Sequence, residues 1–305
     1  MTIDSLPKAT LDQVLEFLEP KPHPFTLIRV GGRSDGAYLV PSEVEALDAC
    51  FSPGVRNKKS FEDDLFYMHG LRSHMADFSS EPQNFDTPLI EPHQTFRKLW
   101  IAAKTDQESI TLDDWIQECE PNGDANLILQ MDIEGGEYGV IPAVSQSALQ
   151  RFSLVVLELH GLRNIAIDGK LNSRFEPTFR RLIRHFVVIH AHPNNCCGWS
   201  APAGSSRRRV PSTLELTLVS KEWLFKLDKE GRLFRSPLVP HPQDIFANVP
   251  MKKPMHLLWE GPTIFSRVVG WSVVARDWAT YLLVWRWRRH VPRRLIEQFR
   301  RVRAQ

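Results

Sequence analysis

The chain has 305 residues, with 38 Lys and Arg against 36 Asp and Glu, and 42% of its residues are apolar. These values exclude a disordered chain, a collagen-like chain and a small disulfide scaffold. At about 150 residues per domain, the length predicts two domains, or one large α/β domain with additions. The chain has only four cysteines, two of them adjacent. Because adjacent cysteines seldom pair with each other, we expect Cys196 and Cys197 to be reduced thiols in a cytoplasmic protein.

The first 44 residues predict an N-terminal extension made of a helix and a β-turn. Residues 9–19 carry leucine and valine at helical spacing, and a Pro-rich stretch ends this helix. Two short extended runs follow, around a turn that contains Asp35 and Gly36. Glycine adopts the positive φ that such turns require. The start of the chain has no basic segment followed by an apolar stretch, so no signal peptide is predicted.

Residues 45–222 predict the main domain, because apolar runs alternate there with amphipathic segments. The expected strands cover residues 49–55, 73–79, 98–103, 126–135, 153–161, 185–195 and 213–221. The expected helices cover residues 60–70, 111–120, 136–151 and 175–185, with Ser60 and Thr111 as caps of the first two. Continuous Val, Ile and Leu runs are typical of parallel strands buried on both faces. The sequence therefore predicts an α/β fold with a doubly wound, Rossmann-like sheet of seven strands and helices on both faces.

The C-terminal region differs in charge from the rest of the chain. Residues 223–260 are Pro-rich and predict an extended segment, whereas residues 261–305 contain ten Arg and two acids. Three tryptophans recur there at seven-residue intervals. This pattern predicts a basic amphipathic helical tail, which either lies on a membrane surface or packs its Trp stripe on the body. Nucleic acid binding is disfavoured because no recognised module accompanies the charge. Residues 264–285 carry three charges, which argues against a membrane-spanning helix.

Polar residues gather where the predicted strands end, and open α/β sheets bind ligands at these carboxyl ends. In strand order these residues are Ser52, Pro53, Gly54, Asp77, Asp132, Glu134, Glu158, His160, His190, His192, Asn194 and Asn195. The loop at Gly54, followed by Asp77, is typical of a nucleotide site in which an acid accepts bonds from ribose hydroxyls. With one glycine and no Walker lysine, the loop suits S-adenosylmethionine better than a pyrophosphate ligand. A plain turn at Gly54 and a cap at Asp77 explain the pair equally well.

Three carboxylates, Asp132, Glu134 and Glu137, follow directly after a buried strand, where they are costly unless they are paired, hydrated or bound to a ligand. The block D-I-E-G-x-E, preceded by T-L-D-D-W-I, resembles the FkbM-type family of S-adenosylmethionine-dependent methyltransferases. The resemblance covers residues 25–222 and includes R-V-G-G-x-x-D-G-A-Y-L-V, C-F-S-P-G-V, M-A-D-F, V-V-L-E-L-H-G-L and H-A-H-P-N-N-C-C-G. It implies the seven-stranded sheet of a methyltransferase domain at residues 45–222.

The resemblance also implies a set of cofactor-binding residues and an acceptor. The cofactor-binding residues would be Ser52, Pro53, Gly54, Ser60, Glu62, Asp77, Phe78 and Asp132. Asp77 would hold the ribose, and Asp132 would face the reacting methyl group. The family is linked to O-methylation of sugars and other secondary metabolites, which implies a hydroxyl acceptor on a small molecule or a glycan.

A sugar hydroxyl is a poor acid, so its methylation calls for a general base or a divalent cation. His160 and His192 are candidate bases, and Asp132 is the third catalytic candidate. Asp132, Glu158 and His160 also form a candidate site for Mg²⁺ or Mn²⁺. Equally, His160 could only orient its loop, and the residues around His192 could form a turn held by Asn side chains.

We therefore expect an S-adenosylmethionine-dependent O-methyltransferase. Two alternatives stay open: a binding or scaffold protein without catalysis on the same fold, and a metal-dependent glycosyl-transfer enzyme. The expected location is the cytoplasm, with peripheral membrane contact through the tail as an open alternative.

Overall fold

The computed structural model describes residues 7–32, 35–200 and 210–229. The predicted tail at 261–305, and the part of the Pro-rich segment beyond residue 229, lie outside these ranges. Among the helices in those ranges, none combines the length and the apolar character needed to cross a bilayer.

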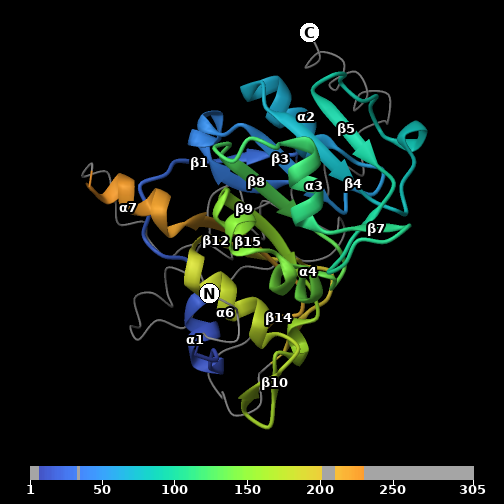
Figure 1. The fold of residues 1–305 in the computed structure, drawn as a ribbon. Helices are drawn as coiled ribbons and strands as arrows, with labels where there is room; N and C mark the ends of the chain where they lie inside the picture. The colour runs from blue at the N-terminus through green and yellow to red at the C-terminus, as the bar shows by residue number, and fades with distance from the viewer. Residues whose placement is uncertain (1–6, 33–34, 201–209, 230–305) are drawn as a thin grey trace, which may run out of the picture.

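A sheet of seven strands forms the centre of the structure (Figure 1). Its strands, in spatial order, are β12 (Phe186–Pro193), β15 (Leu214–Ser220), β9 (Phe152–Leu159), β8 (Leu127–Met131), β3 (Ala49–Pro53), β4 (Arg72–Ala76) and β5 (Gln94–Arg97). The prediction of a seven-stranded α/β sheet is confirmed, but the sheet is mixed. Strand β15 runs antiparallel to both of its neighbours. An antiparallel return needs no crossover helix, and the described part of the β12–β15 connection contains only a short ladder of β13 (Trp199–Ser200) with β14 (Val210–Pro211).

The third predicted strand, at residues 98–103, is misplaced. Strand β5 pairs with β4 at the edge of the main sheet. The predicted segment instead contains β6 (Trp100–Ile101), which pairs with β7 (Ser109–Ile110) in a separate two-stranded sheet. An edge strand needs fewer apolar residues than a central one, so the polar sequence of β5 carries no strong strand pattern.

Helices cover both faces of the sheet, as predicted (Figure 1). One face carries α1 (Leu11–Phe17), α3 (Leu112–Cys119), α4 (Glu137–Ala143), α5 (Gln146–Gln150) and α6 (Glu176–His185). The other carries α2 (Ser60–His69), α7 (Lys221–Lys229) and an antiparallel hairpin of β1 (Leu27–Val30) and β2 (Tyr38–Pro41). Alternate residues of each central strand supply the two cores: Leu127 and Leu129 face the first layer, and Ile128 faces the second.

The N-terminal extension is built into the domain. Helix α1 packs against α6, with the rings of Phe17 and Phe179 6.4 Å apart. The hairpin packs on β15, where the Thr217 hydroxyl donates to the carbonyl of Leu39 at 2.5 Å. The short pair β10 (Ala166–Ile167) and β11 (Lys170–Leu171) lies before α6. A helix and two extended runs therefore lie where they were predicted within the described part of residues 1–44, and both contribute buried residues to the core.

Several helix boundaries differ from the predictions. Ser60 is the first residue of α2 and does not cap it; its hydroxyl donates to the Gly31 carbonyl at 3.0 Å. The Thr111 cap is confirmed, since its hydroxyl accepts from the backbone N–H of Asp114 at 3.1 Å. The single helix predicted for residues 136–151 is two helices, because Ser145 begins a new one by accepting from Ala148 N. Helix α7 occupies the start of the segment predicted as extended.

Cys196 and Cys197 form a disulfide, so the prediction of reduced thiols is wrong for this pair. Cys50 and Cys119 are free. In an extended strand, adjacent side chains point to opposite faces and cannot bridge. The chain turns at residues 195–197, immediately after β12, and this turn brings the two sulfur atoms together.

Candidate active site

The loop after β3 brings three strand ends into contact at Gly54. This glycine has a φ of +89°, and a Cβ placed on it would lie 1.7 Å from the carbonyl oxygen of Asp132. The Gly54 N–H donates to the carbonyl of Ala76 at the end of β4, at 2.9 Å. The N–H of Asp132, just after β8, donates to the carbonyl of Pro53 at 3.2 Å. Only glycine fits here, because both the φ value and the contact exclude a side chain.

Asp77 follows β4 and holds this loop in place. Its carboxylate accepts from the backbone N–H of Arg56 at 2.6 Å and from both the N–H and the hydroxyl of Ser79, at 2.8 and 2.7 Å. The next residue, Phe78, stacks on Trp100 with ring centroids 5.3 Å apart. Asp77 therefore lies at the predicted strand end, and it fixes the shape of the Gly54 loop.

A cavity of about 270 Å³ lies under the Gly54 loop, at the carboxyl ends of β3 and β8. Four of the predicted cofactor-binding residues line it: Gly54, Ser60, Glu62 and Asp132. The other four, Ser52, Pro53, Asp77 and Phe78, lie around it and are not part of its lining. Sequence reasoning missed a contribution from the N-terminal hairpin, which supplies Asp35, Gly36 and Tyr38 to the wall.

A buried chain of polar groups lies along the cavity wall. The Ser52 hydroxyl contacts the carboxyl group of Glu62 and lies 2.5 Å from Oε1 of Gln130. Burial raises the pKa of Glu62 to about 7, although the hydrogen bond from Ser52 acts in the opposite direction. When Glu62 is protonated, it can donate to Ser52 while Ser52 donates to Gln130. This wall therefore satisfies its hydrogen bonds without a net charge.

His160 stands among four carboxylates beyond the end of β9. Its Nδ1 lies 3.1 Å from Oε1 of Glu137, and its Nε2 lies 3.4 Å from Glu134 and 3.7 Å from both Asp132 and Glu158. Burial alone lowers the pKa of His160. The hydrogen bond and charge of Glu137, together with the charges of Asp132 and Glu134, outweigh burial and raise this pKa above 6.5. The imidazole can thus exchange a proton near neutral pH.

Asp132 joins the cavity to this cluster. It lines the cavity, and its Oδ1 is buried without a hydrogen-bond partner. Burial raises the pKa of Asp132 to about 7; His160 lowers it, and the charges of Glu134 and Asp35 raise it. An unsatisfied carboxylate oxygen at the mouth of a cavity is suited to a cation or to a proton donor.

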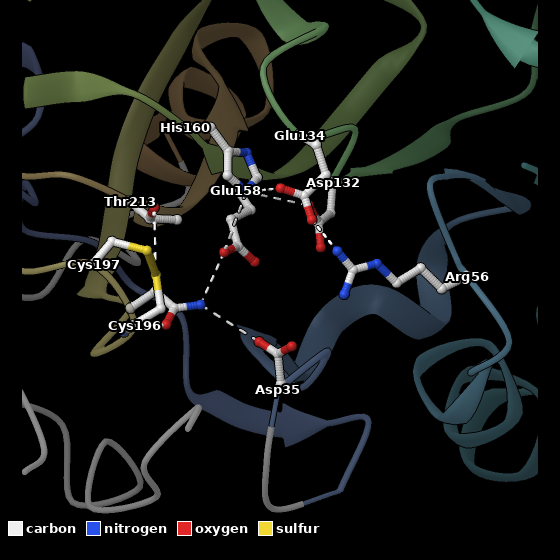
Figure 2. Close-up of a disulfide and its surroundings, with 10 residues drawn as sticks. Asp35, Arg56, Asp132, Glu134, Glu158, His160, Cys196, Cys197 and Thr213 are labelled. Carbon is white, nitrogen blue, oxygen red and sulfur yellow. Dashed lines mark hydrogen bonds and ion pairs between the residues drawn. A yellow bond between two sulfur atoms is a disulfide. The ribbon is translucent and has the colours of Figure 1, made fainter. Parts of the chain in front are cut away.

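The carboxylate of Glu158 belongs to two groups of side chains. Asp132, Glu158 and His160 each offer one ligand atom within 4.8 Å of the others (Figure 2). Asp35, Glu158 and Glu215 do so as well. Burial raises the pKa of Glu158 well above its ordinary value, and the charges of Asp132 and Glu215 add to this effect. The three predicted metal ligands are therefore together, and the second group was not predicted.

Two of the missed residues left a signal in the sequence. Asp35 lies in the D-G-A-Y-L-V segment, which the sequence analysis assigned to a turn, and Glu215 is a single acid within an apolar strand. A lone carboxylate in such a strand is costly unless it has a partner. Glu215 lies opposite Glu158 in the β15–β9 ladder and opposite His192 in the β12–β15 ladder.

The second candidate base, His192, takes a different place from His160. It is buried, and its Nδ1 lies 3.3 Å from Oε2 of Glu215. Its ring stacks on that of His190 with centroids 6.4 Å apart, so these two residues share one face of β12. His192 therefore contacts the cluster through Glu215, and His160 contacts Asp132 itself.

Comparison with known proteins identifies the domain. Residues 47–190 match the family model described as a methyltransferase FkbM domain. No curated protein matches the chain. The matched segment begins just before β3 and ends within β12, so it contains the Gly54 loop, Asp77, Asp132 and His160. Residues 47–190 of this chain are therefore a methyltransferase domain of the FkbM family.

Proposed function

We propose that this protein is an S-adenosylmethionine-dependent O-methyltransferase whose acceptor is a hydroxyl group on a small molecule, a sugar or a glycan. One observation carries the proposal. The cavity under the Gly54 loop and the cluster around His160 share Asp132, so a site for a donor adjoins a site for proton transfer. The FkbM family of the domain supports methyl transfer as the reaction.

The residues around the Gly54 loop fit the proposed cofactor. At Gly54 the loop backbone approaches Asp132 so closely that a Cβ would overlap it. Ser60 and Glu62 line the cavity where the methionine end of the cofactor would lie. Three hydrogen bonds to the loop leave the Asp77 carboxylate about one further lone pair, on Oδ2, which can accept from a ribose hydroxyl. Phe78, the residue after Asp77, stacks on Trp100, and this ring pair offers a flat apolar surface to the adenine base. When bound, S-adenosylmethionine supplies a methyl group on a positively charged sulfur.

The cluster supplies the proton chemistry. With Nδ1–H donated to Glu137, the Nε2 of His160 is free to accept the proton of an acceptor hydroxyl. Asp132 and Glu134 lie on the Nε2 side and stabilise the imidazolium that forms. In this proposal His160 is the base, and Asp132 orients the acceptor and the imidazole. His192 contacts Glu215 and does not contact the acceptor.

A divalent cation fits the same cluster as an alternative to His160 acting as a base, because it would take the Nε2 of His160 while Nδ1–H donates to Glu137. Asp132, Glu158 and His160 combine two carboxylates with an imidazole, and Oδ1 of Asp132 has no hydrogen-bond partner. Such a donor set suits Mg²⁺ or Mn²⁺. When bound, the cation would lower the pKa of a hydroxyl that it coordinates.

Calorimetry with S-adenosylhomocysteine tests the cofactor site. We expect Asp77→Asn to weaken binding about tenfold or more, because the amide NH₂ group cannot accept either from the Arg56 N–H or from a ribose hydroxyl. Ser79→Ala is the matched control: it removes one hydrogen bond to Asp77 and keeps the carboxylate, so its affinity should stay within about twofold of wild type. Equal affinity in Asp77→Asn would remove Asp77 from the site. No heat from the wild type at millimolar concentration would favour a scaffold without catalysis.

Titration of Mn²⁺ tests the metal site. We expect wild-type protein to bind Mn²⁺ with a measurable heat, and Asp132→Asn to lose most of this affinity because it removes a charged ligand. Glu81→Gln is the control, since Glu81 pairs with Lys98 on an exposed surface. Equal heats in wild type and Asp132→Asn would leave His160 as a base acting without a metal.

A further inference from the structure

The disulfide of Cys196 and Cys197 lies beside the cluster, and the proposed chemistry does not use it. Figure 2 shows the disulfide beside Glu158, with Asp35 below both in this view. Cys196 is half-buried and Cys197 is exposed, so a reductant can reach the bond from solvent. An accessible disulfide therefore lies next to the buried carboxyl group of Glu158.

One residue, Asn194, makes this connection. The backbone N–H of Cys196 donates to Oδ1 of Asn194 at 2.9 Å. The Nδ2 of Asn194 donates to Oε1 of Glu158 at 2.9 Å and lies 3.5 Å from Oδ1 of Asp35. The orientation of the buried amide therefore depends on the backbone at Cys196. A reversed amide would place its oxygen against two carboxylates.

The backbone of Asn194 is held separately from its side chain. Its N–H donates to the carbonyl of Thr213 at 3.1 Å, and the N–H of Ser212 donates to the carbonyl of Gly198 at 2.8 Å. These bonds tie both ends of the turn to the segment before β15. Opening the disulfide therefore changes the turn between them, at Cys196 and Cys197, and leaves β12 and β15 in register.

We propose that the Cys196–Cys197 disulfide keeps Asn194 in position as a positioning residue for Glu158 and Asp35, and that reduction of this bond by a dithiol releases it. The oxidised form has the ordered cluster, and in the reduced form Glu158 and Asp35 lose the donor that lies between them. The consequence for methyl transfer, a less ordered acceptor side around Glu158, rests on the proposed function.

The redox step is an ordinary thiol–disulfide exchange. A thiolate of the dithiol attacks the exposed Cys197 sulfur, the bond to Cys196 breaks, and Cys196 leaves as a thiolate that takes up a proton. The second thiol of the reductant then attacks the mixed disulfide and releases Cys197 as a thiol. The protein gains two electrons and two protons, and the dithiol becomes a cyclic disulfide.

The test uses the full chain, with asparagine labelled with ¹⁵N and dithiothreitol as the dithiol. The Asn194 side-chain amide is assigned by its loss in Asn194→Ser. In the oxidised protein we expect a downfield, slowly exchanging amide proton, because it is bonded to a carboxylate. Reduction should move this signal upfield and increase its exchange rate. Cys196→Ser/Cys197→Ser should already show the reduced position and should not respond to dithiothreitol, whereas Cys119→Ser should respond as wild type does.

Two further measurements separate this proposal from the proposed function. Alkylation before and after reduction, read by mass, should add two labels at Cys196 and Cys197; equal labelling before reduction would overturn the proposal, as would an Asn194 signal that reduction does not move. Binding of S-adenosylhomocysteine should be measurable by calorimetry in both the oxidised and the reduced form, because most of the cavity lining lies away from Asn194. Absence of this binding in both forms would reject the methyltransferase proposal and leave the amide result standing.

Discussion

Replacement of Gly54 by alanine is expected to abolish S-adenosylhomocysteine binding and to lower the free energy of unfolding by several kcal/mol. The added Cβ would lie 1.7 Å from the Asp132 carbonyl oxygen, and a backbone atom cannot move aside as a flexible side chain can. The ends of β3 and β8 must separate to relieve this overlap. Their separation breaks the bond from Asp132 N to the Pro53 carbonyl and distorts the cavity.

Gly70→Ala is the matched control for this substitution. Gly70 ends α2 with a φ of +70°, and a Cβ placed there meets nothing within 4 Å. Gly70→Ala should therefore lower the free energy of unfolding only by the strain of a positive φ, about 1 kcal/mol. Urea unfolding and calorimetry on both variants separate the two effects. If Gly54→Ala and Gly70→Ala lose equal stability and both bind S-adenosylhomocysteine, the close approach at Gly54 does not shape the site.

Replacement of Lys59 by methionine is expected to lower the free energy of unfolding by about 3–5 kcal/mol. The Lys59 side chain is fully buried, and its Nζ contacts Asp63 and donates to Oε1 of Gln94 at 2.9 Å. Asp63 also accepts from Nε2 of Gln94 at 3.0 Å and from the Thr87 hydroxyl at 2.6 Å. Methionine fills similar space but leaves the Asp63 carboxylate buried without a cation, and this accounts for the cost.

Two controls identify the source of that loss. Lys59→Met/Asp63→Leu removes both charges and should recover most of the stability, because an apolar pair can replace a buried ion pair. Lys98→Met removes a half-exposed lysine that pairs with Glu81 and should cost less than about 1 kcal/mol. Urea unfolding at pH 7 measures all three. A loss below 1 kcal/mol in Lys59→Met would mean that water or a local rearrangement compensates Asp63.

Lys59 connects this ion pair to the cavity under the Gly54 loop. It directly precedes α2 and lies at the end of the loop that begins at Gly54. The N–H of Asp63 donates to the Lys59 carbonyl at 2.9 Å, so the buried side chain and the first turn of α2 are held together. Both ends of the cavity loop are therefore fixed, one by Gly54 against Asp132 and the other by Lys59.

Local patterns accounted for most of the elements. Central strands such as β8 and β9 carry continuous apolar runs, because both of their faces are buried, and they were predicted correctly. The edge strand β5 was missed, since a strand with one neighbour and partly exposed side chains has no such run. The positions of Asp132 and His160 could also be predicted. Each directly follows a central strand, and the carboxyl ends of neighbouring parallel strands lie close together.

The sequence by itself determined the central strands, the two helical layers, the FkbM-type domain and the grouping of Asp132, Glu158 and His160. Buried strands carry continuous apolar runs, and these three residues lie at the ends of two such strands. Only the tertiary structure decided that Asp35 and Asn194, 159 positions apart, meet over Glu158, and that the adjacent cysteines pair. A contact at that separation depends on how the hairpin packs against β15, and no local period records it. Formation of the disulfide likewise depends on the backbone of the turn at residues 195–197, which brings the two sulfur atoms together.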